Sequence, residues 1–349
     1  MQESVQRKTQ YGFVDVIKFL LALLIVSSHY ISENAVGRIN GFVDYASSLY
    51  VIVVPFFFAC SGFFLFRKLD DKFENWSKVK IYCKKIMVMY AGWSIVYFLF
   101  TACTWIRFGT TTESVLHYLL NALTYSTYKT IWFLPATVIG VLLTYYLTKK
   151  MGAKETITIG AILYLIGCLG ASYSFLIPEN SVLNLYDYIF SSTRNGVFNG
   201  FPFILIGYFI AQKEKKGFSE SKIKNLIFTA IFGMAFAAEA VVIKRKGAVN
   251  VNTLIFLLPF TYFFLMWCLE IRIQTTEKTM MLRKISTDVF LCQRIYLSSL
   301  PALLPETIFE RLLTGNPYVG LISMLLLSLI TAVFLIELSK RNKWLAQFF

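Results

Sequence analysis

The chain has 349 residues, of which 56% are hydrophobic and only 15% are charged. Ordinary soluble domains carry about 25% charged residues, so this composition argues against a water-soluble protein and favours a membrane protein. The formal net charge of +14 could suit nucleic acid, but such binding needs basic residues gathered on one folded face. Here they lie between apolar runs, and we expect no nucleic-acid partner.

Apolar runs of about spanning length follow one another along the whole chain, since a helix needs about 20 residues to cross a bilayer. They lie near residues 13–31, 46–66, 86–106, 131–148, 156–177, 195–211, 226–243, 251–271, 285–304 and 317–338. Asp288 and Arg294 interrupt the ninth run, so nine spans is the alternative count. We predict an all-α fold, a polytopic membrane helical bundle of about ten transmembrane helices, in a single domain over residues 1–349.

The first run resembles a retained helix more than a secretory signal peptide. It extends from Phe13 to Ile31 and ends in SSHYISEN, without a small-residue cleavage site. We therefore count it as the first transmembrane helix.

The distribution of Lys and Arg predicts the orientation. With a cytoplasmic N-terminus, 24 of the 34 basic residues fall in inner segments and seven in outer loops. Short cytoplasmic loops carry an excess of such residues, so we expect a multi-pass cell-membrane protein with both termini in the cytoplasm. The cluster Lys244–Lys246 lies outside in this arrangement and runs against the rule.

The six cysteines form no CxxC pair, and most lie within apolar runs. A thiol in such a run behaves as a small hydrophobic group. We expect neither a disulfide nor a bound metal.

Three ionisable residues lie in the first run, where such groups are costly and often functional. They are Asp15, Lys18 and His29. Helical geometry places Lys18 and His29 about 20° apart around the axis and roughly 16 Å apart along it, while Asp15 is spaced to pair with the Lys18 ammonium. The simpler alternative is an interfacial ion pair, with Lys18 reaching the inner headgroups and His29 the outer ones.

His29 is the more informative of the two histidines, because imidazole titrates near neutral pH, as a general base requires. His117 lies in the outer segment 107–130, whose apolar residues at helical spacing suggest that it lies along the membrane interface. We expect His117 to be a solvated or interfacial residue.

The order of these and later motifs resembles the acyltransferase-3 family of membrane enzymes over almost the whole chain. That family opens with an Asp, a basic residue three positions later and a His eleven beyond it, as do Asp15, Lys18 and His29. The stretch VPFFFACSGFFLFRK, with Ser61, Gly62, Arg67 and Lys68, is similar to its second signature. IWFLPA, with Trp132, and TRNGVFNGFPFILIG, with Arg194, are similar to later ones.

Two positions depart from the family pattern. Lys18 stands where Arg is usual, which keeps the charge but loses the bidentate fork of a guanidinium. Gln293 stands where relatives often have a His, and it is followed by Arg294. Since Gln cannot act as a base, a mechanism that needs two histidines is in doubt. Arg294 is a candidate to bind an anion or to pair with an acidic residue such as Asp288 or Glu239.

The resemblance implies a membrane acyltransferase that moves an acyl group, most often acetyl, from acyl-CoA to a hydroxyl of a cell-envelope sugar or a related acceptor. His29 would be the general base, and Asp15 and Lys18 would shape the donor end. Acyl-CoA enters as a co-substrate, with no bound cofactor, and membrane lipid is the other expected partner. Donor-binding candidates are Lys18, Arg67 and Lys68; further site candidates are Ser61, Trp132, Arg194, Gln293 and Arg294.

Two rival interpretations stay open at this point. One is a transport or uptake module for a small polar substrate such as an amino acid, because a related membrane domain occurs fused to serine racemases and buried ionisable residues also mark substrate paths. The other is a scaffold or sensor that has the fold without turnover.

Overall fold

The computed structural model describes residues 11–35, 39, 48–69, 75–178, 181–217, 221–248, 250–305, 307–342 and 345–348. Their regular structure is helical, and the β-pairing among them is a single isolated bridge between Tyr11 and Ile273. The predicted all-α fold is therefore confirmed. The chain forms two compact units that alternate along the sequence.

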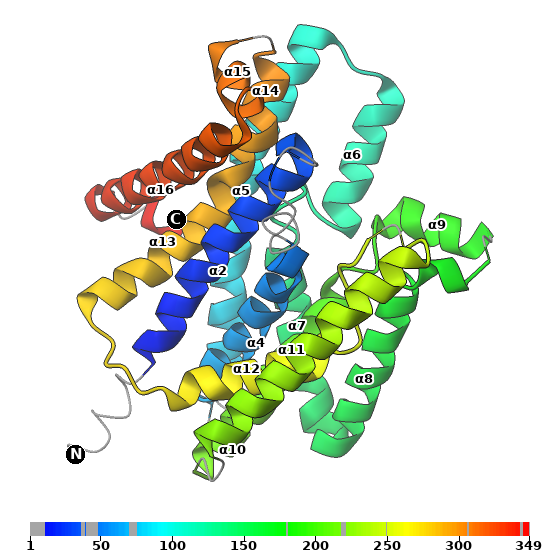
Figure 1. Ribbon diagram of the computed structural model, residues 1–349, viewed down its shortest axis with the longest axis vertical. Helices are drawn as coiled ribbons and strands as arrows, with labels where there is room; N and C mark the ends of the chain where they lie inside the picture. The colour runs from blue at the N-terminus through cyan, green and yellow to red at the C-terminus, as the bar shows by residue number, and fades with distance from the viewer. Residues whose placement is uncertain are drawn as a thin grey trace. The chain divides into compact units, whose positions relative to one another are not determined.

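Unit 1 comprises Met1–Val53, Ala91–Leu116 and Ile271–Phe349. In chain order its helical elements are α2 (Gly12–Tyr30), η1 (Ile31–Ala35), η2 (Ser48–Ile52), the second half of α5 (Asn75–Phe108), α13 (Glu277–Arg294), η5 (Ile295–Ser299), α14 (Leu300–Leu303), α15 (Ile308–Thr314), α16 (Pro317–Arg341) and η6 (Leu345–Gln347). Helix α13 lies along α2 and also packs against α16 (Figure 1).

Gly12, the first residue of α2, lies in close contact with the chain that leads into α13. The Gly12 N–H donates to the Ile273 carbonyl over 2.9 Å. A Cβ at Gly12 would lie 2.6 Å from the Gln274 carbonyl oxygen, closer than real Cβ contacts. The absence of a side chain at residue 12 thus lets α2 begin directly against the chain that leads into α13.

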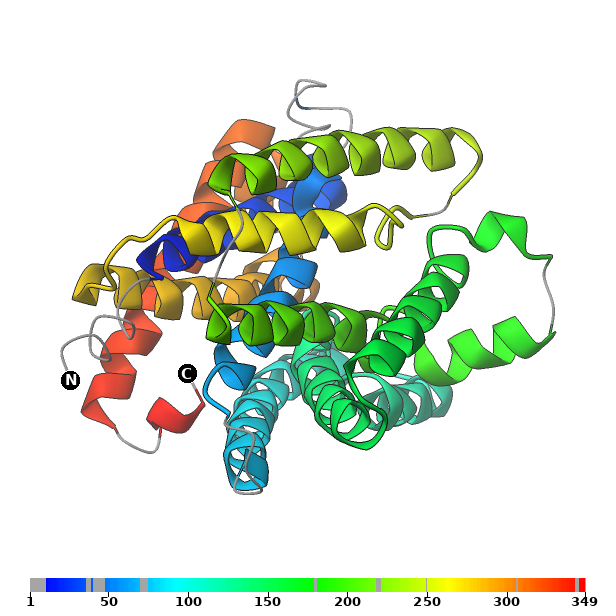
Figure 2. The same cartoon turned by 90° about the horizontal axis from the view of Figure 1, so that it is seen from below.

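Unit 2 comprises Val54–Tyr90 and His117–Glu270. Its elements are most of α4 (Val53–Phe66), the first half of α5, the second part of α6 (Thr112–Thr124), α7 (Phe133–Met151), α8 (Ala153–Leu169), η3 (Ser174–Leu176), α9 (Ser181–Phe190), η4 (Gly196–Gly200), α10 (Phe201–Lys215), α11 (Lys222–Arg245) and α12 (Leu257–Glu270). Helix α10 packs against α7, α8 and α12, while α11 runs beside α12 (Figure 2).

Each of the ten apolar runs overlaps a helix, but the helices differ in length and polarity. Among the described residues, five helices are long and apolar enough to cross a membrane: Gly12–Ala35, Leu49–Phe66, Asn75–Phe108, Lys222–Arg245 and Pro317–Arg341. Others are too short, since α10 has 15 residues and α12 has 14. The structure is that of a helical membrane protein, and the count of ten spans stays a prediction.

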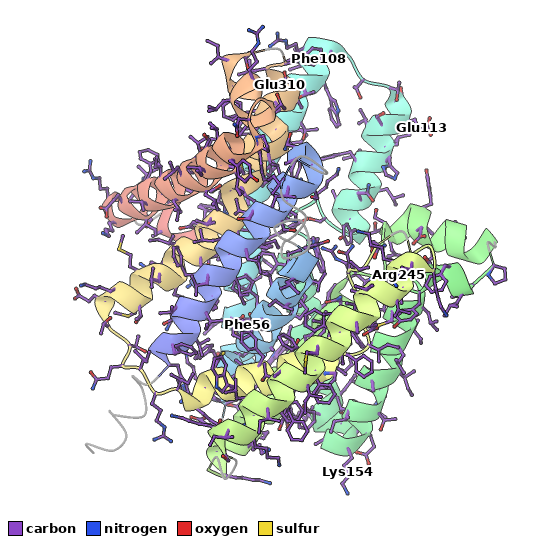
Figure 3. All side chains as sticks on the ribbon, viewed as in Figure 1. Phe56, Phe108, Glu113, Lys154, Arg245 and Glu310 are labelled. Carbon is purple, nitrogen blue, oxygen red and sulfur yellow. The ribbon has the colours of Figure 1, made fainter. Side chains whose placement is uncertain are left out.

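The outward face of α16 illustrates the apolar surface of unit 1. Ile322, Leu326, Ile330 and Phe334 recur every four residues, and their exposed fractions lie between 52% and 64%. Residues at this spacing share one face of a helix. A contiguous apolar face of this kind is unfavourable in water and suits lipid. Figure 3 shows side chains projecting outward along α16.

Candidate active site

His29 and Gln293 meet at the contact between α2 and α13. The His29 Nδ1 lies 3.0 Å from the Gln293 Oε1. The Gln293 side chain is fully buried, and its Nε2 donates to the Phe290 carbonyl over 3.0 Å. Because that carbonyl can only accept, the amide oxygen faces the imidazole, and Nδ1 must carry the proton of this bond. The neutral ring then has Nε2 as its unprotonated nitrogen.

Next to Gln293, Arg294 forms an ion pair with Glu33 of η1. Arg294 is 8% exposed, and its Nε atom is buried without an acceptor among the described residues. The suggested pairing with Asp288 or Glu239 is wrong, because the carboxylate that binds Arg294 is that of Glu33, four positions after His29. The Glu239 carboxylate, in unit 2, instead accepts from the Tyr173 hydroxyl and from the backbone N–H groups of the two residues that precede α12.

The Asp15 carboxylate is fully buried at the other end of α2. Arg283 of α13 binds it through both oxygens, with Nε to Oδ1 at 2.7 Å and Nη2 to Oδ2 at 2.8 Å. Sequence spacing had instead indicated Lys18 as the partner of Asp15, and Arg283 was not among the candidate site residues. Asp15 lies 14 residues before His29, roughly 21 Å along a helix, so the two side chains do not act on the same atom.

Lys18 lies one turn beyond Asp15 and is partly buried. His29 lies close to the ring of Tyr50 in η2, with 6.0 Å between ring centroids. The structure therefore brings His29, Gln293, Arg294, Glu33 and Tyr50 together at one end of unit 1.

The remaining donor candidates lie in unit 2, at the end of α4. Arg67 forms an ion pair of 2.9 Å with Glu214 near the end of α10, and both side chains are mostly buried, with 17% and 18% exposed. Lys68 follows it and is exposed. The Lys215 ammonium donates to the Leu69 carbonyl over 2.5 Å. Three basic residues and one carboxylate thus gather where α4 and α10 end.

Ser61 is partly exposed and precedes Gly62, which lies in close contact with α10. A Cβ at Gly62 would lie 2.3 Å from the Ile204 carbonyl oxygen. A Cβ at Gly207 would lie 2.1 Å from the Ala59 carbonyl oxygen. The second motif therefore serves helix packing as well as any role of Ser61.

Trp132 and Arg194 form a second cluster in unit 2. The Arg194 guanidinium lies 5.0 Å from the centroid of the Trp132 ring, which also stacks with Tyr125 at 6.0 Å. Asn195 caps the start of η4 by accepting from the N–H groups of Val197 and Phe198. Burial raises the pKa of Tyr125, and the nearby Arg194 charge partly opposes this shift.

Three π-helical segments in the described part of the chain adjoin these motifs. Segment η1 begins two residues after His29, η4 begins two residues after Arg194, and η5 begins directly after Arg294. Such segments are rare and occur frequently at functional sites. They carry no recognisable sequence signal, so the sequence analysis missed them. Within the described residues, no group of three or more His, Cys, Asp or Glu side chains is arranged to hold a metal ion.

The sequence profile of the acyltransferase-3 family (Acyl_transf_3), described as an acyltransferase domain, matches residues 11–337. The chain belongs to the acyltransferase-3 family.

Curated relatives of this acyltransferase-3 chain carry racemase names. It is 32% identical over 257 residues to an amino-acid racemase from Enterococcus faecalis, covering 70% of this chain and 35% of that protein. It is 25% identical over 260 residues to a serine/alanine racemase from Enterococcus gallinarum, covering 72% of this chain and 36% of the relative. The chain thus spans about a third of the length of these relatives. No solved structure matches.

Proposed function

We propose that this protein is a membrane acyltransferase that moves an acetyl group from acetyl-CoA to a hydroxyl of a cell-envelope sugar or a related acceptor. The observation that carries the proposal is the His29 imidazole, which occupies the family's motif position and binds Gln293 through Nδ1. In the neutral ring, Nε2 is thereby the unprotonated nitrogen. An imidazole of this kind suits a general base near neutral pH.

In the proposed reaction, His29 Nε2 takes the proton of the acceptor hydroxyl as its oxygen attacks the thioester carbon. A new C–O bond forms, the C–S bond breaks, and the thiolate of CoA leaves with the proton returned by the imidazolium. Donors aimed at the oxyanion that forms during such a step usually provide much of the rate enhancement. Arg294, next to Gln293, is the cation that we assign to this neighbourhood.

The donor would enter from the cytoplasm. With both termini cytoplasmic in a multi-pass cell-membrane protein, Asp15 and Lys18 lie toward the inner end of α2 and His29 toward the outer end. Lys18 of unit 1 would contact a phosphate of acyl-CoA, and Arg67 and Lys68 of unit 2 are separate candidates for such a contact. Phosphate contacts and proton transfer would then be separated along the membrane normal, and the acceptor would approach from outside.

Transfer of radiolabelled acetyl from acetyl-CoA to a cell-envelope fraction of the source organism, by purified protein in lipid nanodiscs, tests the proposal. A general base contributes roughly 10²–10⁴-fold to rate, so His29→Ala and His29→Gln should both lose nearly all turnover. His117→Ala is the matched control, since His117 is the chain's second histidine, and it should keep normal turnover. Near-normal turnover in both His29 variants would exclude the general-base role.

A second candidate, amino-acid uptake, is favoured by the names of the relatives, an amino-acid racemase and a serine/alanine racemase. The matched segment makes up 35% and 36% of those proteins, so the remainder of each could hold racemase activity while the segment moves its substrate. Uptake of labelled serine by proteoliposomes, without acetyl-CoA, would support this candidate. Acetyl transfer in the absence of serine uptake would exclude it.

A further inference from the structure

We propose that Gln293 is a positioning residue that fixes His29 as the Nδ1–H tautomer, so that Nε2 alone serves as the base. The catalytic consequence rests on the proposed acyl transfer. The tautomer itself is a property of the folded protein and can be measured without turnover. The two ideas can therefore fail separately.

The first step of the inference is the fixed direction of the Gln293 amide. Its Nε2 donates to the Phe290 carbonyl, one turn back on α13, and its Oε1 faces His29 Nδ1. Rotating the amide by 180° would set the NH₂ group against His29 and the oxygen against another carbonyl, which loses the bond to Phe290. The buried side chain therefore presents an acceptor to the imidazole and holds it there.

The second step is the anchoring of the α13 end that carries Gln293. Four consecutive residues contact four different elements. Tyr97 of α5 donates its hydroxyl proton to the Leu291 carbonyl. The Cys292 thiol lies 3.6 Å from the Ser328 carbonyl of α16. Gln293 contacts α2, and Arg294 pairs with Glu33 of η1. A side chain held in this way keeps its partner in one geometry, as a positioning residue must.

The third step is chemical. Free histidine in water prefers the tautomer with the proton on Nε2, in which Nδ1 would be the base. A hydrogen bond from Nδ1–H to a fixed acceptor reverses that preference, and the second nitrogen is then directed away from the acceptor. An amide can do this as a carboxylate does, as in cysteine proteases with a Cys-His-Asn arrangement. Gln293 has no titrating proton, so His29 is the single proton-exchanging group of the pair.

The test uses nitrogen-15 NMR of histidine-labelled protein in micelles, at a pH where His29 is neutral. The chain has two histidines, so a His117→Gln background leaves only the His29 signals. We expect Nδ1 to be protonated and Nε2 to be unprotonated. Gln293→Leu removes the acceptor and should convert His29 largely to the Nε2–H tautomer. Gln293→Glu keeps an acceptor and should keep Nδ1–H.

A matched control and a kinetic measurement complete the experiment. Ser286→Ala removes another buried side-chain donor from α13, one that bonds only within the helix, and should leave the tautomer unchanged. In the acetyl-transfer assay, Gln293→Leu should lower kcat roughly 10–100-fold with little change in KM. Gln293→His should keep most of the kcat of the unmodified protein. If His29 carries its proton on Nε2 in the unmodified protein, or if Gln293→Leu leaves the tautomer unchanged, the positioning role is excluded. If the tautomer responds as expected but no variant transfers acetyl, the positioning stands and the acyltransferase proposal fails.

Discussion

Arg283 binds both carboxylate oxygens of Asp15, and the two side chains differ sharply in exposure. The Asp15 side chain is 0% exposed, whereas that of Arg283 is 45% exposed. A buried carboxylate requires a partner because the loss of hydration is costly. The bidentate guanidinium of Arg283 supplies this partner, and the contact connects α2 to α13, the helix that also carries Gln293.

Replacing Arg283 with Ala should destabilise unit 1. It leaves the Asp15 carboxylate buried without its guanidinium partner, and a hydrogen bond to a charged group contributes roughly 1.5–3 kcal/mol. Arg283→Lys should lose less stability, because lysine keeps the positive charge although it cannot bind both carboxylate oxygens as a guanidinium does. Thermal unfolding in detergent, followed with a thiol-reactive dye, would measure this. Cys292 is buried in unit 1 and would react only when that unit unfolds.

The control for this prediction is Lys284→Ala, which removes a positive charge from the same turn of α13. Lys284 is exposed, so its loss should leave the apparent Tm nearly unchanged. Equal apparent Tm values for Arg283→Ala and Lys284→Ala would mean that the bidentate contact contributes nothing to stability.

Much of the fold could be predicted from apolar runs alone, because a membrane helix must satisfy its own backbone hydrogen bonds and be apolar along its length. Element ends were less predictable. The third run, near 86–106, underestimates α5, which begins at Asn75. Its first turns carry Lys78, Lys80, Lys84 and Lys85, which are polar but still helical. Hydropathy detects the part of a helix that suits lipid, and not the helical extension outside it.

The candidate site was only partly accessible to sequence reasoning. Asp15, Lys18 and His29 lie on one continuous helix, α2, as their spacing predicted, because helical geometry is local. The contacts of His29 with Gln293 and of Arg294 with Glu33 join residues more than 260 positions apart. Only tertiary packing creates such contacts. From the sequence, Gln293 argued only against a mechanism that needs two histidines, whereas the structure gives Gln293 a defined hydrogen-bonding role.

Gly62→Ala should destabilise unit 2. The new methyl group would lie 2.3 Å from the Ile204 carbonyl oxygen, so α4 and α10 would have to move apart. Overpacking of this kind costs about 1–3 kcal/mol. Gly233→Ala in α11 is the matched control, because its methyl group would meet the Phe260 ring at an ordinary 3.4 Å. Chemical unfolding of both variants in detergent should show a loss of stability only for Gly62→Ala. An equal loss of stability in both variants would exclude the close packing of α4 and α10 as the cause.

The orientation can be tested by cysteine labelling in a Cys-free background. Lys154 and Lys216 are exposed, lie in predicted inner segments and should be shielded from an impermeant reagent in intact cells. Glu113 is exposed and Glu310 is partly exposed; both lie in predicted outer segments and should be labelled when replaced by Cys. Figure 3 marks three of these positions. Labelling at residue 154 or 216 in intact cells, with protection at 113 and 310, would show that the orientation is the opposite of the predicted one.

The donor site can be tested through the ion pair between Arg67 and Glu214. If Arg67 contacts a CoA phosphate, Glu214 competes for the same guanidinium, because the pair is mostly buried with its atoms 2.9 Å apart. Arg67→Ala should weaken CoA binding roughly 10-fold, the size of one charge-assisted hydrogen bond. Glu214→Gln should strengthen it, since the guanidinium no longer has a carboxylate partner. Lys18→Ala should weaken binding, and Lys18→Arg should retain it.

Equilibrium binding of CoA to the protein in neutral-lipid nanodiscs would measure these changes, with Lys216→Ala as the control. Lys216 is an exposed cation that follows α10, and its loss should leave the affinity unchanged. The sign of the Glu214→Gln effect decides between two roles for Arg67. A donor ligand gives opposite shifts in affinity for Arg67→Ala and Glu214→Gln. If Arg67 serves only to hold α4 against α10, both variants lower stability and neither changes affinity, because the contact that each removes is the same one.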